Sequence, residues 1–119
     1  MDKMLKRIGT FNKKYNSILS SQFPLAPIYK SEGLKSHIMK RHPNCVKYET
    51  KIKEILEHPD FVGSKDNGSI EFIKIYNDNI LLALQLDSKK GYFYVASLYD
   101  ISTSKLNNRL HSGRIKPTK

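Results

Sequence analysis

The stretch SIEFIKIYNDNILLALQLDSKKGYFYVASLY, residues 69–99, decides the fold because its apolar residues follow the two-residue period of β-strands. Apolar and polar residues alternate over residues 69–76, and residues 80–86 are almost entirely apolar, as is typical of a central strand. Residues 92–99 make a third segment of this kind, and turn signals separate all three. The stretch therefore predicts sequential antiparallel strands in a meander.

The segments on either side of this stretch complete the expected sheet and add a final helix. Residues 61–63 predict a short strand, joined to the next one by an Asn-Gly turn at residues 67–68. Residues 102–111 predict a helix with a serine or threonine as its N-cap and Gly113 just past its end. Residues 114–119 are expected to form a loose tail.

The N-terminal half follows helical spacing instead. It predicts three helices, over residues 12–19, 34–42 and 46–56. A short element ending near Ile8 precedes them, and two prolines make residues 23–29 an extended connector with an edge strand at Ile28-Tyr29. The expected fold class is α+β, with a helical N-terminal half packed on a four-stranded antiparallel meander sheet and a C-terminal helix.

Positive charge is concentrated at both ends of the chain. The 21 Lys and Arg residues against 11 Asp and Glu give a net charge of +10. Residues 1–59 have 12 basic and 5 acidic residues, and residues 101–119 have 5 basic residues and no acidic one. The middle, residues 60–100, has 4 basic and 6 acidic residues. If the two ends meet, they form one cationic surface, which favours nucleic acid as partner over a membrane or an acidic protein.

Composition and spacing argue against several classes of protein. The single cysteine, Cys45, cannot form a disulfide within the chain, so we expect a reducing compartment, the cytoplasm. There is no apolar signal-peptide core near Met1 and no run long enough to cross a membrane, so no membrane partner is expected. His37 and His42 diverge by about 140° on a helix and have no acidic ligand between them, so no metal or other cofactor is expected.

The helix expected over residues 34–42 holds most of the candidate catalytic groups. His37 and Arg41, four residues apart, share one face, and His42 lies on the adjoining edge. An imidazole with a pKa of about 6.5 can take or give a proton near neutral pH, and a guanidinium fits phosphate oxygens. Ser102 is a further candidate, as a substrate contact or as a helix cap.

These groups suffice for cleavage of RNA without a metal. The RNA 2′-hydroxyl can attack the neighbouring phosphate once a base takes its proton, and DNA lacks that hydroxyl. Four further residues are candidates to bind nucleic acid, three as cations on the backbone and one as a ring that stacks a base: Lys40, Lys105, Arg109 and Tyr99. Simpler interpretations remain open, such as a boundary histidine at 37, sheet packing by Tyr99, or a salt bridge of Arg41 with Glu71 or Glu32.

Five motifs follow one another along the chain: Gly33-Leu34-x-x-His37-Ile38-x-x-Arg41-His42-Pro43, His58-Pro59-Asp60-Phe61-Val62-Gly63, Ser69-Ile70-Glu71, Leu84-x-Leu86-Asp87 and Tyr94-Val95-Ala96-x-x-Tyr99-x-Ile101-Ser102-x-Ser104-Lys105. Together they resemble the phage-type barnase–EndoU–colicin–RelE-like (PBECR) nuclease domain family, over roughly residues 30–115. The resemblance implies helices on a four-stranded antiparallel sheet and a metal-independent ribonuclease, used as a phage or mobile-element effector that is delivered into a host. It also implies a site with two sides, which are His37, Arg41 and His42 on one, and Tyr99, Ser102 and Lys105 on the other.

The expected organisation is a single domain over residues 1–119. It comprises an N-terminal extension at 1–29, a nuclease-like core at 30–115 and a loose tail at 116–119. The expected function is a metal-independent endoribonuclease of the toxin type, monomeric or weakly oligomeric, with RNA as its partner. The alternatives are a non-catalytic basic nucleic-acid-binding module of a mobile element, and a protein-interaction domain that meets an acidic immunity or antitoxin protein.

Overall fold

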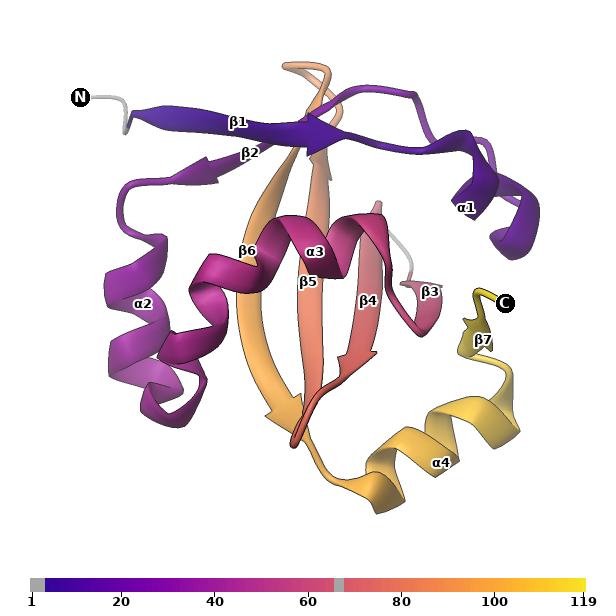
Figure 1. The fold of residues 1–119 in the computed structure, drawn as a ribbon. Coiled ribbons are helices and arrows are strands. Elements are labelled where there is room, and N and C mark those ends of the chain that lie inside the picture. Colours follow the sequence, from indigo (N-terminus) through magenta and orange to yellow (C-terminus); the bar gives the residue numbers. More distant parts are fainter. Residues whose placement is uncertain (1–3, 66–67) are drawn as a thin grey trace.

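Seven strands form one mixed sheet in the part of the chain that this computed structural model describes, residues 4–65 and 68–119 (Figure 1). The strands are β1 (Leu5–Thr10), β2 (Pro27–Ser31), β3 (Phe61–Lys65), β4 (Ser69–Ile75), β5 (Asn79–Asp87), β6 (Tyr92–Ile101) and β7 (Ile115–Pro117). Their order across the sheet is β1-β2-β6-β5-β4-β3-β7. The helices are α1 (Lys13–Leu19), α2 (Leu34–Arg41), α3 (Ile52–Glu57), α4 (Thr103–Ser112) and the 3₁₀ helix η1 (Pro43–Lys51).

The expected fold class, a helical N-terminal half on a four-stranded antiparallel sheet, is wrong. Strands β3 to β6 do follow one another as antiparallel neighbours, but they make only the centre of the sheet. Residues from both chain ends extend it with β1, β2 and β7, and β2 runs parallel to β6. The predicted Asn-Gly turn at residues 67–68 includes residue 67, which lies outside the described residues.

Strand β1 was concealed by its own irregularity. Leu5 and Ile8 are three residues apart, which imitates a helix, and the pairing with β2 shifts register between Arg7 and Gly9. Such a bulge breaks the two-residue alternation that marks a strand in a sequence. Its partner β2 is not an edge strand, because it lies between β1 and β6.

The pairing of β2 with β6 is short, and this shapes the candidate site. Only Ile28 with Phe93 and Tyr29 with Tyr94 are paired in register. Among the described residues, the later part of β6 therefore has no strand partner on the side of β2, and it borders helix α2, which lies beside it in Figure 1.

The helix expected over residues 46–56 is instead η1 followed by α3. Pro43 occupies the first turn of η1, where its missing N–H has no intrahelical partner to lose. The buried residues Cys45 and Tyr48 are three apart, which suits the three-residue turn of a 3₁₀ helix. From Ile52 onward the buried positions return to α-helical spacing.

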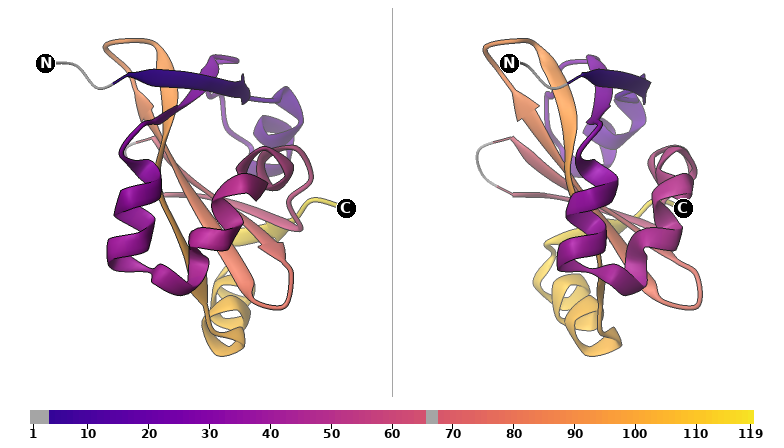
Figure 2. Two further views of the ribbon diagram at one scale, coloured as in Figure 1. Left: turned by 60° about the vertical axis from the view of Figure 1, so that its left-hand side comes forward. Right: turned by 90° about the vertical axis from the view of Figure 1, so that its left-hand side faces the viewer.

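The two faces of the sheet carry separate apolar cores. The larger core lies under α1, α2, η1 and α3, and its sheet residues include Ile70, Phe72 and Leu82. The smaller core lies on the opposite face under α4 and β7, around Ile73 and Leu81. The right-hand view of Figure 2 shows α3 and α4 on opposite sides of the strands. Within residues 4–65 and 68–119, no helix is long and apolar enough to cross a bilayer.

The expected loose tail contains strand β7, which pairs antiparallel with β3. Gly113 ends α4 with φ at 80°, the left-handed conformation that the sequence predicts for the residue past the helix. Gly63 faces the returning chain, and a Cβ there would lie 2.2 Å from the Arg114 carbonyl oxygen. The close approach of β7 to β3 therefore requires glycine at position 63.

Candidate active site

The imidazole of His42 lies against the ring of Tyr99. Helix α2 ends at Arg41. The backbone of His42 is no longer helical, with φ at −142° and ψ at 65°, as the following proline favours. This turns His42 toward β6, where its ring centroid lies 5.4 Å from that of Tyr99 with an interplanar angle of 31°. Because Tyr99 belongs to the face that carries α4, the half-buried His42 connects α2 with that face.

The other candidates on α2 remain on the helix surface. His37, Lys40 and Arg41 are exposed, while Leu34 and Ile38 face the core. No hydrogen bond or ion pair holds the side chains of His37 and Arg41 to another residue within the described parts of the chain. The alternative interpretation of Arg41, a salt bridge with Glu71, is not found, because Glu71 pairs with Arg109 and Arg114 on the opposite face of the sheet.

Ser102 is the N-cap of α4. Its Oγ accepts a hydrogen bond from the backbone N–H of Lys105 at 3.1 Å. The Asn79 side-chain amide donates to the Ile101 carbonyl at 3.2 Å and to Thr103 Oγ1 at 3.3 Å, which fixes the junction between β6 and α4. The start of α4, with the exposed Lys105, is thereby attached to the strand that carries Tyr99.

Replacing Ser102 by alanine is expected to lower the free energy of unfolding by about 1 kcal/mol, because one backbone donor of α4 loses its acceptor. Urea denaturation measures this change. The control is Ser104→Ala, which removes an exposed hydroxyl from the same helix without removing the cap. Equal stability of the Ser102 and Ser104 variants would contradict the capping role, and a loss of activity beyond the loss of stability would indicate substrate contact.

Glu71 is the buried acidic residue of the site and was missed as a functional candidate. It is 2% exposed and faces α4 from β4. Its Oε1 accepts from Arg114 Nε at 2.7 Å, and its Oε2 lies 3.5 Å from Arg109 Nη2. One signal was present in the sequence, since Glu71 is a charged residue within an apolar, alternating strand. No sequence signal identified Arg114 as a functional candidate, because residues 114–119 were expected to form a loose tail.

Tyr99 connects the two groups of residues. Burial raises the pKa of its hydroxyl, the charge of Glu71 raises it further, and Arg109 and Arg114 lower it. Tyr99 therefore lies within electrostatic reach of the Glu71 cluster while its ring packs on His42. Tyr99 thus contacts His42 and lies within electrostatic reach of Arg109, which lines a groove together with Lys105 of α4.

A cysteine nucleophile is excluded at this site. Burial raises the pKa of Cys45 to about 11, and its contact with Asp100 at 3.5 Å acts in the same direction. The thiol is therefore protonated at neutral pH. A hydrogen bond from Asn44 lowers the pKa of the Asp100 carboxyl, and the charge of His42 lowers this pKa further. Within residues 4–65 and 68–119, no group of three or more His, Cys, Asp or Glu side chains could hold a metal ion.

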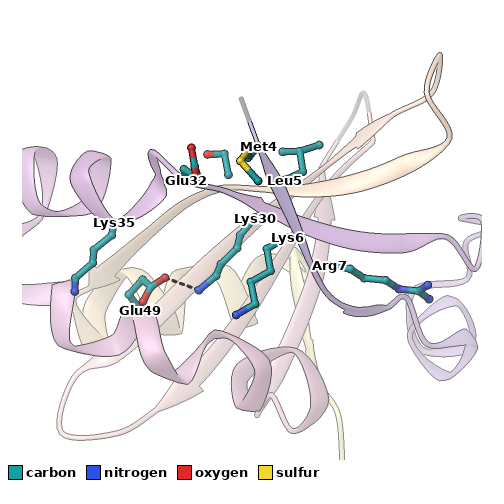
Figure 3. Close-up of a pocket in the computed structure, with 9 residues that line it drawn as sticks. Met4, Leu5, Lys6, Arg7, Lys30, Glu32, Lys35 and Glu49 are labelled. Atoms are coloured by element: carbon teal, nitrogen blue, oxygen red, sulfur yellow. Dashed lines mark hydrogen bonds and ion pairs between the residues drawn. The ribbon is translucent and has the colours of Figure 1, made fainter. Parts of the chain in front are cut away.

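A hollow of about 690 Å³ lies apart from these residues, between β1, β2 and the start of α2 (Figure 3). Its lining is mostly charged, and Lys30 Nζ lies 2.7 Å from Glu49 Oε1. No histidine is among the described residues that line it. Because it lacks a group that exchanges protons near neutral pH, we place the candidate active site at His42 and Tyr99.

One family model matches this chain, over residues 6–108, with the description phage-Barnase-EndoU-ColicinE5/D-RelE like nuclease 3. The match starts within β1, well before the resemblance over residues 30–115 that the motifs suggested. It includes His42, Glu71 and Tyr99 and stops one residue before Arg109. No curated protein and no solved structure matches the chain.

Proposed function

Because this chain belongs to the phage-Barnase-EndoU-ColicinE5/D-RelE like nuclease 3 family, we propose that it is a metal-independent endoribonuclease. The observation that carries this proposal is the packing of the His42 imidazole on Tyr99, on the strand that leads into α4 and its Lys105. It supplies a proton carrier and cations in one region. The family places the chain among nuclease-like proteins, and the choice of RNA and the mechanism are our own inference.

The proposed reaction is an attack of the RNA 2′-hydroxyl oxygen on the adjacent phosphorus. A histidine takes the hydroxyl proton, the bond from phosphorus to the 5′-oxygen breaks, and an acid returns a proton to that leaving oxygen. The products are a 2′,3′-cyclic phosphate and a free 5′-hydroxyl. His42 is the principal proton carrier in this scheme, and His37 is the second.

The negative charge that grows on the phosphate needs cations nearby. Arg41 and Lys105 serve this role, one at the end of α2 and one on α4. Lys40 and Arg109 extend the cationic surface along the RNA backbone, and Tyr99 is the ring on which a base stacks. Selection of RNA over DNA follows from the chemistry, because only RNA has the attacking hydroxyl.

Purified protein is expected to cut a mixed-sequence RNA in the presence of EDTA and to leave a DNA strand of the same sequence intact. Gel electrophoresis and mass spectrometry of the fragment ends measure this outcome, with a 2′,3′-cyclic phosphate as the expected product. A requirement for a divalent metal would contradict the mechanism. Intact RNA at every protein concentration would contradict the enzymatic proposal itself.

The alternative proposal is a non-catalytic module that binds nucleic acid through the same exposed cations. It predicts strong, salt-dependent binding with no cleavage. An acidic immunity or antitoxin protein is the partner that we propose for the same basic surface, which it would cover in competition with RNA.

A further inference from the structure

We propose that the groove between α4 and the segment leading into β7 binds a phosphate of the RNA backbone, and that buried Glu71 positions the two arginines that hold it. The groove has a volume of about 450 Å³ and is lined by Lys105, Asn108, Arg109, Ser112 and Arg114. The identity of the ligand as RNA rests on the proposed function. The groove itself is a separate subsite from the His42–Tyr99 contact.

The sheet is shaped to receive these arginines. On β4, Glu71 pairs in register with Gly63 of β3 and with Ala83 of β5, so the same face has two small neighbours beside it. This leaves room above the carboxylate for two long side chains. Arg109 and Arg114 occupy that room, with 15% and 32% of their side chains exposed.

The backbone holds the two arginines at a fixed separation. The N–H of Arg114 donates to the Arg109 carbonyl at 3.0 Å, and the N–H of Gly113 also donates into the last turn of α4. Both arginines therefore belong to the capping structure that ends the helix. A guanidinium pair fixed in this way loses little conformational freedom when it binds an anion.

Some of their donors have no acceptor among the residues that the structure describes. Arg109 Nε and Arg114 Nη2 are buried and make no hydrogen bond to any described residue. An unsatisfied buried donor costs about 1–3 kcal/mol, and a small rotation of either guanidinium toward a phosphate oxygen in the groove would relieve that cost. One carboxylate against the charges of Lys105, Arg109 and Arg114 leaves the cluster positive. The cluster is therefore suited to a phosphodiester anion.

The position of the groove is suited to binding a phosphate next to the one that is cleaved. Tyr99 packs on His42 at one end and lies in the electrostatic field of Glu71, Arg109 and Arg114 at the other. A strand bound along this surface would place one phosphate in the groove and another near His42. The groove would then hold a neighbouring, uncleaved phosphate of the same strand.

The test compares Arg114→Gln with Lys116→Gln, which removes the same charge from the exposed side of β7, outside the groove. Fluorescence anisotropy with a labelled single-stranded DNA measures binding without cleavage. Arg114→Gln is expected to weaken binding about tenfold and to reduce the salt slope by about 0.7, as for one lost phosphate contact. Lys116→Gln is expected to change the affinity less than twofold. Equal effects of the two variants would overturn the subsite.

Glu71→Gln separates positioning from simple electrostatics. The variant gains positive charge, so an account based only on charge predicts tighter binding. The positioning role predicts weaker binding, because an amide has one acceptor oxygen and cannot hold both arginines. Tighter binding by a folded variant would overturn this role. If Glu71→Gln fails to fold, Arg114→Lys decides, since it keeps the charge and loses the guanidinium fork, and unchanged affinity would overturn the proposal.

The binding experiment does not depend on the enzymatic proposal. A DNA strand has no 2′-hydroxyl, so its affinity reports phosphate binding without cleavage, and the comparison of Arg114→Gln with Lys116→Gln isolates the contribution of the groove. Loss of binding in Arg114→Gln together with intact RNA in the cleavage assay would support the groove and remove the ribonuclease. If the protein cleaves RNA but Arg114→Gln and Lys116→Gln bind DNA equally well, the ribonuclease proposal is supported and the phosphate subsite is overturned.

Discussion

His42→Ala is expected to lower the rate of RNA cleavage by at least about 100-fold, because a positioned proton carrier contributes roughly 10²–10⁴ to such a reaction. His42 is half-buried on Tyr99, which restricts its imidazole, whereas His37 is exposed on α2. We therefore expect the larger loss at position 42. Initial rates measured across a range of pH should also lose one limb of the profile in this variant.

The matched control for this substitution is His111→Ala, which removes an exposed imidazole from the last turn of α4. It is expected to cleave RNA at close to the rate of the unmodified protein. Thermal unfolding of both variants separates chemistry from stability, because the contact of His42 with Tyr99 is also a packing contact. A His42→Ala protein that is folded and cleaves as fast as His111→Ala would contradict the assignment.

Gly63→Ala is expected to lower the free energy of unfolding by about 3 kcal/mol, at the upper end of the range for overpacking. The new Cβ would lie 2.2 Å from the Arg114 carbonyl oxygen and 2.8 Å from Ile115 Cγ2, so β7 must move away from β3. Arg114 would then leave Glu71, and DNA binding in the groove should weaken with it. Chemical denaturation and anisotropy measure the two effects.

Gly9→Ala is the control for the conformational effect of losing a glycine. A Cβ at Gly9 would meet no atom within 4 Å, and its φ is not in the left-handed region. The free energy of unfolding of the Gly9→Ala variant is expected to differ from that of the unmodified protein by less than about 1 kcal/mol. If Gly63→Ala were as stable as Gly9→Ala, the close approach of β7 to β3 would not be needed for the fold.

The central strands could be predicted because each carries its own periodicity. Residues 69–76 alternate and residues 80–86 are continuously apolar, and β4 and β5 lie at these positions. Helix α2 and the Ser102 cap of α4 likewise depend on local signals, namely a proline after the helix and a serine before it. Local signals of this kind survive in a single sequence.

The added strands could not be predicted because they depend on partners distant in the chain. A register shift disrupts the alternation of β1, β2 pairs with β6 over two residues, and β7 has only three residues. The same limit applies to the site. His42 and Tyr99 were both candidates, but their contact depends on the turn at Pro43, and the Glu71–Arg114 pair depends on β7.

The order of the strands in the chain has a consequence during translation. Strand β2 is synthesised about 65 residues before its partner β6, roughly 3–13 s at about 5–20 residues per second. Arg109 and Arg114 emerge from the ribosome later still, after every strand of the sheet except β7. A nascent chain therefore cannot complete the groove between α4 and β7 until the residues of β7 have left the ribosome.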